Sequence, residues 1–96
     1  MKKQIDSSDM NVLMDAVLTL KDRDEVSRFF DDLCTIGELE AMQQRLVVAQ
    51  MLTDEKTYQD IAEVTGASTA TISRVNRTLR YGNKGYEIAL KRLKAE

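Results

Sequence analysis

Residues 57–80 read TYQDIAEVTGASTATISRVNRTLR, and their pattern predicts two short helices joined by a tight turn. Thr57 can accept hydrogen bonds from first-turn amides, so it predicts the start of a short helix over residues 58–64. Gly66 suits the positive φ that ends a helix, and Ser68 suits the cap of a second helix over residues 69–79 or 69–80. Two short helices joined by a turn that contains glycine are typical of a helix-turn-helix motif, which we place within residues 57–80.

The apolar and polar positions of this motif fall on different faces. Ile61 and Ala62 on the first helix, with Ile72 and Val75 on the second, predict the inner face. Short hydroxyl and methyl groups can contact base edges, and arginines can contact phosphates. We therefore expect the outer face to bind DNA, flanked by donors at the start of the first helix and by basic residues after the second. The candidate contacts are Thr57, Tyr58, Gln59, Ser68, Thr69, Ala70, Thr71, Ser73, Arg74, Arg77, Arg80 and Lys84.

The charge of the chain is divided unevenly along its length. The net charge is −2, yet residues 1–56 hold seven Lys and Arg against twelve Asp and Glu, whereas residues 57–96 hold seven against four. No acidic residue lies between Glu63 and Glu87, so the cations from Arg74 to Lys84 form a basic stripe. Such a stripe can bind phosphate even in an acidic protein, although a charge run alone also fits a solvated helix face.

The rest of the chain also has helical patterns, with no internal repeat. Apolar residues at helical spacing predict helices over about 9–21 and 24–34, and a last helix that carries Tyr86, Ala89, Leu90 and Leu93. Thr35 and Glu38 have the form of a capping box, so a longer helix is expected from Thr35 to about Leu52. The first and third helices have apolar residues on more than one side. We therefore expect an all-α fold of six helices and burial against a second chain in a homodimer.

The composition gives no support to several classes of function. The chain has 96 residues, which fit a single domain, and it has no His, no Pro and one Cys. Without histidine or paired cysteines we expect no metal site and no cofactor, and scattered carboxylates such as Asp31 and Asp32 give no support to an enzyme. No apolar run is long enough to cross a bilayer, and no apolar segment follows Lys2 and Lys3, so we expect a cytoplasmic protein without membrane contact.

The stretch from Thr57 to Arg80, above all GASTATISR at 66–74, resembles the reading head of the Trp repressor family. Residues 33–52 resemble the helix that leads into that head, and YGNKGY at 81–86 is similar to the ending of the Trp-repressor-related YerC/YecD group. The resemblance covers about residues 26–80. It implies a Trp-repressor-like fold and an intertwined homodimer that meets successive major grooves of a near-palindromic operator in double-stranded DNA.

The resemblance also implies a possible effector site. The family's tryptophan repressors hold their corepressor between two arginines, which Arg45 and Arg74 match, with Thr35, Thr71 and Thr78 at or near the assisting positions. Where those repressors have glycine after the second arginine, this chain has Val75, whose side chain would occupy space that an indole ring needs. We therefore do not expect tryptophan as the ligand, and an ion pair of Arg45 with Glu38, Glu40 or Asp60 is an equal alternative.

Two hypotheses follow from these patterns. The main one is a sequence-specific DNA-binding transcriptional regulator, expected to repress by covering its operator. The alternative is a helical module that holds an acidic protein partner with the same surface, without sequence-specific DNA binding.

Overall fold

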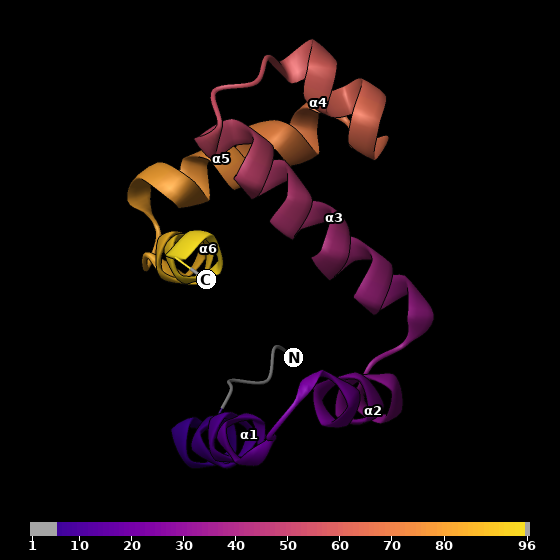
Figure 1. Cartoon of the computed structure of the whole chain (residues 1–96), viewed down its shortest axis with the longest axis vertical. Coiled ribbons are helices and arrows are strands. Elements are labelled where there is room, and N and C mark those ends of the chain that lie inside the picture. The colour runs from indigo at the N-terminus through magenta and orange to yellow at the C-terminus, as the bar shows by residue number, and fades with distance from the viewer. Residues whose placement is uncertain (1–5, 96) are drawn as a thin grey trace. The chain divides into compact units, whose positions relative to one another are not determined.

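A computed structural model describes residues 6–95 and contains six α-helices and no strand over that range (Figure 1). The all-α, six-helix prediction is therefore confirmed. The start of the chain, with Lys2 and Lys3, lies outside the described residues. The helices are α1 Ser7–Thr19, α2 Arg23–Leu33, α3 Ile36–Thr53, α4 Tyr58–Thr65, α5 Thr69–Tyr81 and α6 Gly85–Ala95.

The described residues group into two compact units, one ending at Ile36 and the other beginning at Gly37. In the first unit, Asp6 caps α1 by accepting a hydrogen bond from the Ser8 amide at 2.8 Å. The hydroxyl and the amide of Ser8 both donate to this carboxylate, which lowers the pKa of Asp6 below its ordinary value. Asp22 caps α2 in the same way, accepting from the Glu25 amide at 2.9 Å.

No residue of α1 or α2 is fully buried. The large apolar side chains Val12, Met14 and Leu18 of α1 are exposed. Phe29 and Phe30 of α2 contact each other edge to face with ring centroids 5.7 Å apart, and both are half-buried. Two amphipathic helices cannot make a core of their own from such positions. Part of the apolar surface of the first unit is therefore exposed.

The core lies in the second unit and draws on four helices. It consists of the buried residues Val48, Ala49, Ile61, Ala67, Ile72, Val75 and Leu90, which come from α3, α4, the turn before α5, α5 and α6. The expected inner face of the motif is confirmed, because Ile61 and Ile72 are fully buried and Val75 is 2% exposed. Burial of these side chains fixes α4 and α5 on the same core as the end of α3.

The observed helix limits lie within two residues of those expected. The largest difference that bears on the site is at the end of α5, which continues to Tyr81 rather than ending at residue 79 or 80. It ends there because Gly82, whose amide still donates to the Thr78 carbonyl at 2.8 Å, adopts an extended backbone with φ −86° and ψ −156°. The link to α6 is therefore only the three residues 82–84.

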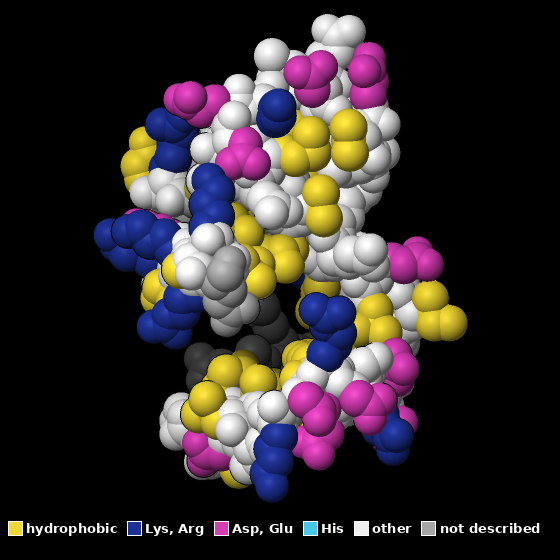
Figure 2. All heavy atoms as spheres, in the orientation of Figure 1, with side chains coloured by type: hydrophobic (Ala, Val, Ile, Leu, Met, Phe, Trp, Pro, Cys, Tyr) yellow, Lys and Arg dark blue, Asp and Glu magenta, His cyan; other side chains and the backbone are white. Residues whose placement is uncertain are grey.

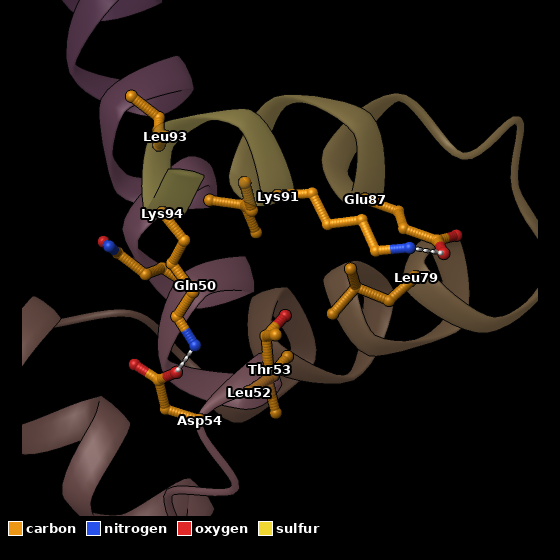
Figure 3. A pocket seen from close by; sticks show the side chains of 10 residues that line it. Gln50, Leu52, Thr53, Asp54, Leu79, Glu87, Lys91, Leu93 and Lys94 are labelled. Atoms are coloured by element: carbon orange, nitrogen blue, oxygen red, sulfur yellow. Dashed lines mark hydrogen bonds and ion pairs between the residues drawn. The ribbon is translucent and has the colours of Figure 1, made fainter. Parts of the chain in front are cut away.

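An apolar groove separates the end of α3 from α6 (Figure 3). Its volume is about 520 Å³, and Leu52, Leu79, Leu90 and Leu93 line it. Two ion pairs border it, Lys94 with Asp54 at 3.4 Å and Lys91 with Glu87 at 3.8 Å. The second unit thus also has apolar surface open to solvent.

Over the described residues, no helix is both long enough and apolar enough to cross a membrane.

Candidate nucleic-acid interface

The turn between α4 and α5 has the backbone that its sequence predicts. Gly66 has a φ of 72°, in the left-handed region, and its amide donates to the Ala62 carbonyl at 2.9 Å. Ser68 then caps α5, because its hydroxyl accepts from the Thr71 amide at 3.1 Å. Thr57 caps α4 in the same manner, accepting from the Asp60 amide at 3.1 Å. These local bonds set where each helix of the motif begins and where the first one ends.

Side chains from outside the turn hold it in place. The amide nitrogen Nε2 of Gln44 on α3 donates to the Thr65 carbonyl at 3.1 Å, and this bond satisfies a carbonyl at the end of α4. The Thr65 hydroxyl donates to the Ile61 carbonyl at 2.7 Å and accepts from the Ala67 amide at 3.1 Å. The turn is therefore anchored both to α3 and to α4, which fixes the direction in which α5 leaves it.

The outer face of α5 is open to solvent along its length. While Ile72, Val75 and Leu79 point to the core, the residues opposite them on the helix are exposed. The exposed set contains the predicted contacts Ser68, Thr69, Ala70, Ser73, Arg74, Arg77 and Arg80. Small side chains stand at the amino end of this face and arginines toward its carboxyl end. A helix with this face free can enter a DNA major groove.

The remaining predicted contacts have more particular positions. Thr57 and Gln59 are exposed at the start of α4, whereas Tyr58 is half-buried and its hydroxyl oxygen accepts a hydrogen bond from Nδ2 of Asn76 at 3.2 Å. Thr71 is half-buried, and its hydroxyl accepts from Ser68 at 3.1 Å. Lys84 is exposed and lies in the link after α5, where it adopts a φ of 67°. The structure therefore brings most of the predicted set onto one face, with Thr71 turned toward the cap.

The cations of this region have no acidic partner within residues 6–95. The ion pairs there join Arg28 to Asp24, Lys91 to Glu87 and Lys94 to Asp54, and none of them includes Arg74, Arg77, Arg80 or Lys84. Figure 2 shows Lys and Arg side chains gathered over the carboxyl end of α5 and over α6. Unpaired cations beside a row of small polar side chains are free to bind phosphate groups.

Sequence reasoning missed three residues that shape this surface. Tyr81 is 83% exposed and, because α5 extends to it, lies seven residues after Arg74 and four after Arg77 on the same face. That spacing was visible in the sequence, but the helix was expected to end too early. Gln44 and Asn76 act through bonds to residues 21 and 18 positions away, and no local pattern signals such pairs.

Of the five residues predicted for an effector, all but Thr71 are exposed. Arg45 and Arg74 are both exposed, and neither has an ion pair in the described part of the chain, so the expected alternative of an Arg45 pair with Glu40 or Asp60 is not observed. The Thr78 hydroxyl donates to the Arg74 carbonyl at 3.2 Å. Thr35 is exposed and belongs to the first unit. Val75, directly after Arg74, fills part of the core. Within the described residues no group of His, Cys, Asp and Glu could hold a metal ion.

The buried inner face, the glycine turn and the free basic face of α5 define a helix-turn-helix DNA-binding protein. The sequence pattern of the Trp repressor protein family matches residues 8–94. The chain belongs to the Trp repressor family, which is a family of DNA-binding regulators, and it is similar to its YerC group.

Individual relatives agree with this assignment. The uncharacterized protein YerC of Bacillus subtilis is 56% identical over 86 residues, which are 90% of this chain and 83% of that protein. The structure of a TrpR-like protein from Eubacterium eligens has a TM-score of 0.88 and 55% identity, and the match covers 91% of this chain and 90% of that one. A crystal structure of a candidate Trp repressor from Staphylococcus aureus also has a TM-score of 0.88, with 48% identity over 93% of this chain and 89% of the other.

Proposed function

We propose that this protein is a transcriptional repressor that binds a near-palindromic operator through the outer face of α5. The observation that carries the proposal is the exposed face of that helix, where Thr69, Ala70 and Ser73 stand beside arginines that have no acidic partner within residues 6–95. The short side chains would read base edges and the arginines would hold phosphates. A protein that covers its operator in this way blocks access of the transcription machinery.

We also propose that the protein forms a homodimer. Two observations support a second copy as the partner that covers the open apolar surface: α1 and α2 contain no buried residue, and the groove between α3 and α6 is lined by leucines. A chain of 96 residues buries only about 60–65% of its unfolded surface when alone, so a dimer is a reasonable source of further core. A two-fold symmetric protein would match a two-fold symmetric operator with half-sites about one helical turn apart.

Control by a small molecule is a separate part of the proposal. Arg45 and Arg74 are available to an anionic effector, because both are exposed and neither is paired within the described residues. We do not expect tryptophan as the ligand, because Val75 adds a β-branched side chain next to Arg74. Val75 is only 2% exposed. Replacing it by a smaller residue would cost buried apolar surface rather than simply open a site.

Selection of bound fragments from a random duplex library tests this function. Purified protein is incubated with the library at about 0.1 M salt, where the screening length is about 10 Å, with and without added tryptophan. We expect enrichment of one two-fold symmetric sequence, and the same enrichment in both conditions. Enrichment that appears only with tryptophan would contradict the effector proposal. Fragments without any common sequence would favour a protein-interaction module instead of an operator-binding repressor.

A further inference from the structure

One hydrogen bond between side chains joins the two helices of the motif. Nδ2 of Asn76 on α5 donates to the hydroxyl oxygen of Tyr58 on α4 at 3.2 Å, and both side chains are half-buried. Asn76 lies four residues after the buried Ile72 and directly before the exposed Arg77. It therefore stands at the border between the core face and the outer face of α5. This bond is thus made at the edge of the surface that we propose for DNA.

The direction of the bond leaves Tyr58 with a hydrogen to donate. A phenol can accept hydrogen bonds at its oxygen and has one hydrogen of its own. Because Asn76 supplies the hydrogen of the shared bond, the Tyr58 hydroxyl acts there as the acceptor. Within residues 6–95 no group accepts the hydrogen of that hydroxyl. An acceptor for it has to come from water or from a bound molecule.

The position of Tyr58 favours a negatively charged acceptor. Tyr58 is the first residue of α4, after the cap Thr57, and the amino end of a helix is its positive end. In helix-turn-helix proteins the first helix crosses the DNA backbone. A hydroxyl that already accepts a hydrogen bond is also a stronger donor, because bonds in a chain polarise one another. A backbone phosphate oxygen meets all of these conditions.

We propose that Asn76 is a positioning residue, which orients the Tyr58 hydroxyl so that its hydrogen is donated to a DNA backbone phosphate. This inference rests on the proposed DNA-binding function and adds to it a residue that does not itself touch DNA. Asn76 acts through Tyr58, so the two residues form one unit in binding. The contact carries no sequence information, because every nucleotide has the same phosphate.

A double-mutant cycle on DNA affinity tests the inference. The probe is a fluorescent 30-base-pair duplex of mixed sequence, titrated with the full chain at low salt and followed by anisotropy. Tyr58→Phe removes a hydrogen bond to a charged group, so we expect binding about tenfold weaker. Asn76→Leu should weaken binding in the same direction. The double variant should bind no more weakly than Tyr58→Phe alone, because without the hydroxyl Asn76 has nothing to orient.

A further variant separates positioning from a merely structural role. Asn76→Asp can only accept, so it keeps the two helices joined but takes the hydroxyl hydrogen for itself. We expect a thermal unfolding midpoint close to that of the wild type and clearly weaker DNA binding. Part of the loss of affinity comes from repulsion between the new carboxylate and the DNA phosphates. Asn76→Asp in the Tyr58→Phe background measures this repulsion alone, and there the loss of affinity should be smaller. Tyr86→Phe is the matched control, since Tyr86 is also half-buried but lies on α6.

The outcomes separate this inference from the function on which it rests. Single effects that multiply in the double variant would overturn the role of Asn76 while leaving DNA binding established. Losses of affinity that follow the unfolding midpoint across all variants would do the same, because Asn76 would then only brace the fold. A wild-type protein that binds no duplex at any salt concentration would overturn the proposed function and this inference together.

Discussion

Gly66 determines the backbone conformation of the turn in the motif. Its φ of 72° is rarely adopted by residues with a side chain, yet a Cβ added there would meet no atom within 4 Å. The cost of a substitution is therefore one of backbone conformation alone. Gly82 differs, because a Cβ there would lie 2.5 Å from the Thr78 carbonyl oxygen that accepts the last amide bond of α5.

Substitution of Gly66 by alanine should destabilise the fold by about 1 kcal/mol, since it forces a side chain into the left-handed region. The control is Gly37→Ala, which lies within α3, where an added Cβ also meets nothing within 4 Å. Alanine is the better helix former, so this control should raise stability by about 0.5 kcal/mol. Urea unfolding followed by circular dichroism measures both. Equal effects of the two substitutions would mean that the turn does not require its left-handed residue.

Arg77 is the residue that best tests the phosphate contacts. It is exposed and has no ion pair within residues 6–95, so we expect Arg77→Ala to weaken binding to all duplexes alike. The slope of log K against log salt should become shallower by about 1, the loss of one neutralised phosphate. Arg92→Ala removes the same charge from α6, outside the motif, and should leave the slope nearly unchanged. An unchanged affinity of Arg77→Ala at low salt would show that the stripe is a solvated face.

Among the elements, α4 and α5 are the ones that the sequence predicts best. Their caps and their turn depend on residues at most four positions apart, so local chemistry determines where they start and where α4 ends. The end of α5 was predicted one or two residues too early. The supports from Gln44 and Asn76 could not be predicted, because each depends on how separate helices pack.

The packing of α5 on the core gives a prediction for stability. Ile72 is fully buried, so Ile72→Ala should reduce the free energy of unfolding by about 2–5 kcal/mol through lost contacts and a cavity. Val64→Ala on α4 also removes apolar atoms, but Val64 is 69% exposed and the change should stay within about 0.5 kcal/mol. Thermal unfolding of both variants measures the difference. Similar losses of stability at the two positions would mean that Val64 is covered in solution, so that burial within one chain does not predict the effect of a substitution.

At the scale of the whole molecule, the main feature is the apolar surface that a single chain leaves exposed. Exposed side chains such as Val12, Leu18 and Leu93 occur in both units. Apolar patches on a protein surface often mark an interface. The sequence indicated the excess of apolar residues on its first and third helices, but which residues a partner covers depends on the arrangement of two chains.

A homodimer should be detected by sedimentation equilibrium. We expect a mass twice that of the 10.9 kDa chain at micromolar concentration. The thermal midpoint should also rise with protein concentration, because association stabilises the folded state by mass action. A 10.9 kDa species whose midpoint does not depend on concentration would contradict the dimer and, with it, the two-fold symmetric operator.

The outer face of α5 is proposed to read base pairs, and a comparison of the DNA sequences selected by the wild type and by Thr69→Ala tests this role. Thr69 is exposed at the amino end of that face, where small side chains can contact base edges. We expect a two-fold symmetric site for the wild type, and for Thr69→Ala a changed preference at one position in each half-site with the salt dependence retained. Identical preferences for the two proteins, or the absence of any symmetric site, would contradict this role of α5.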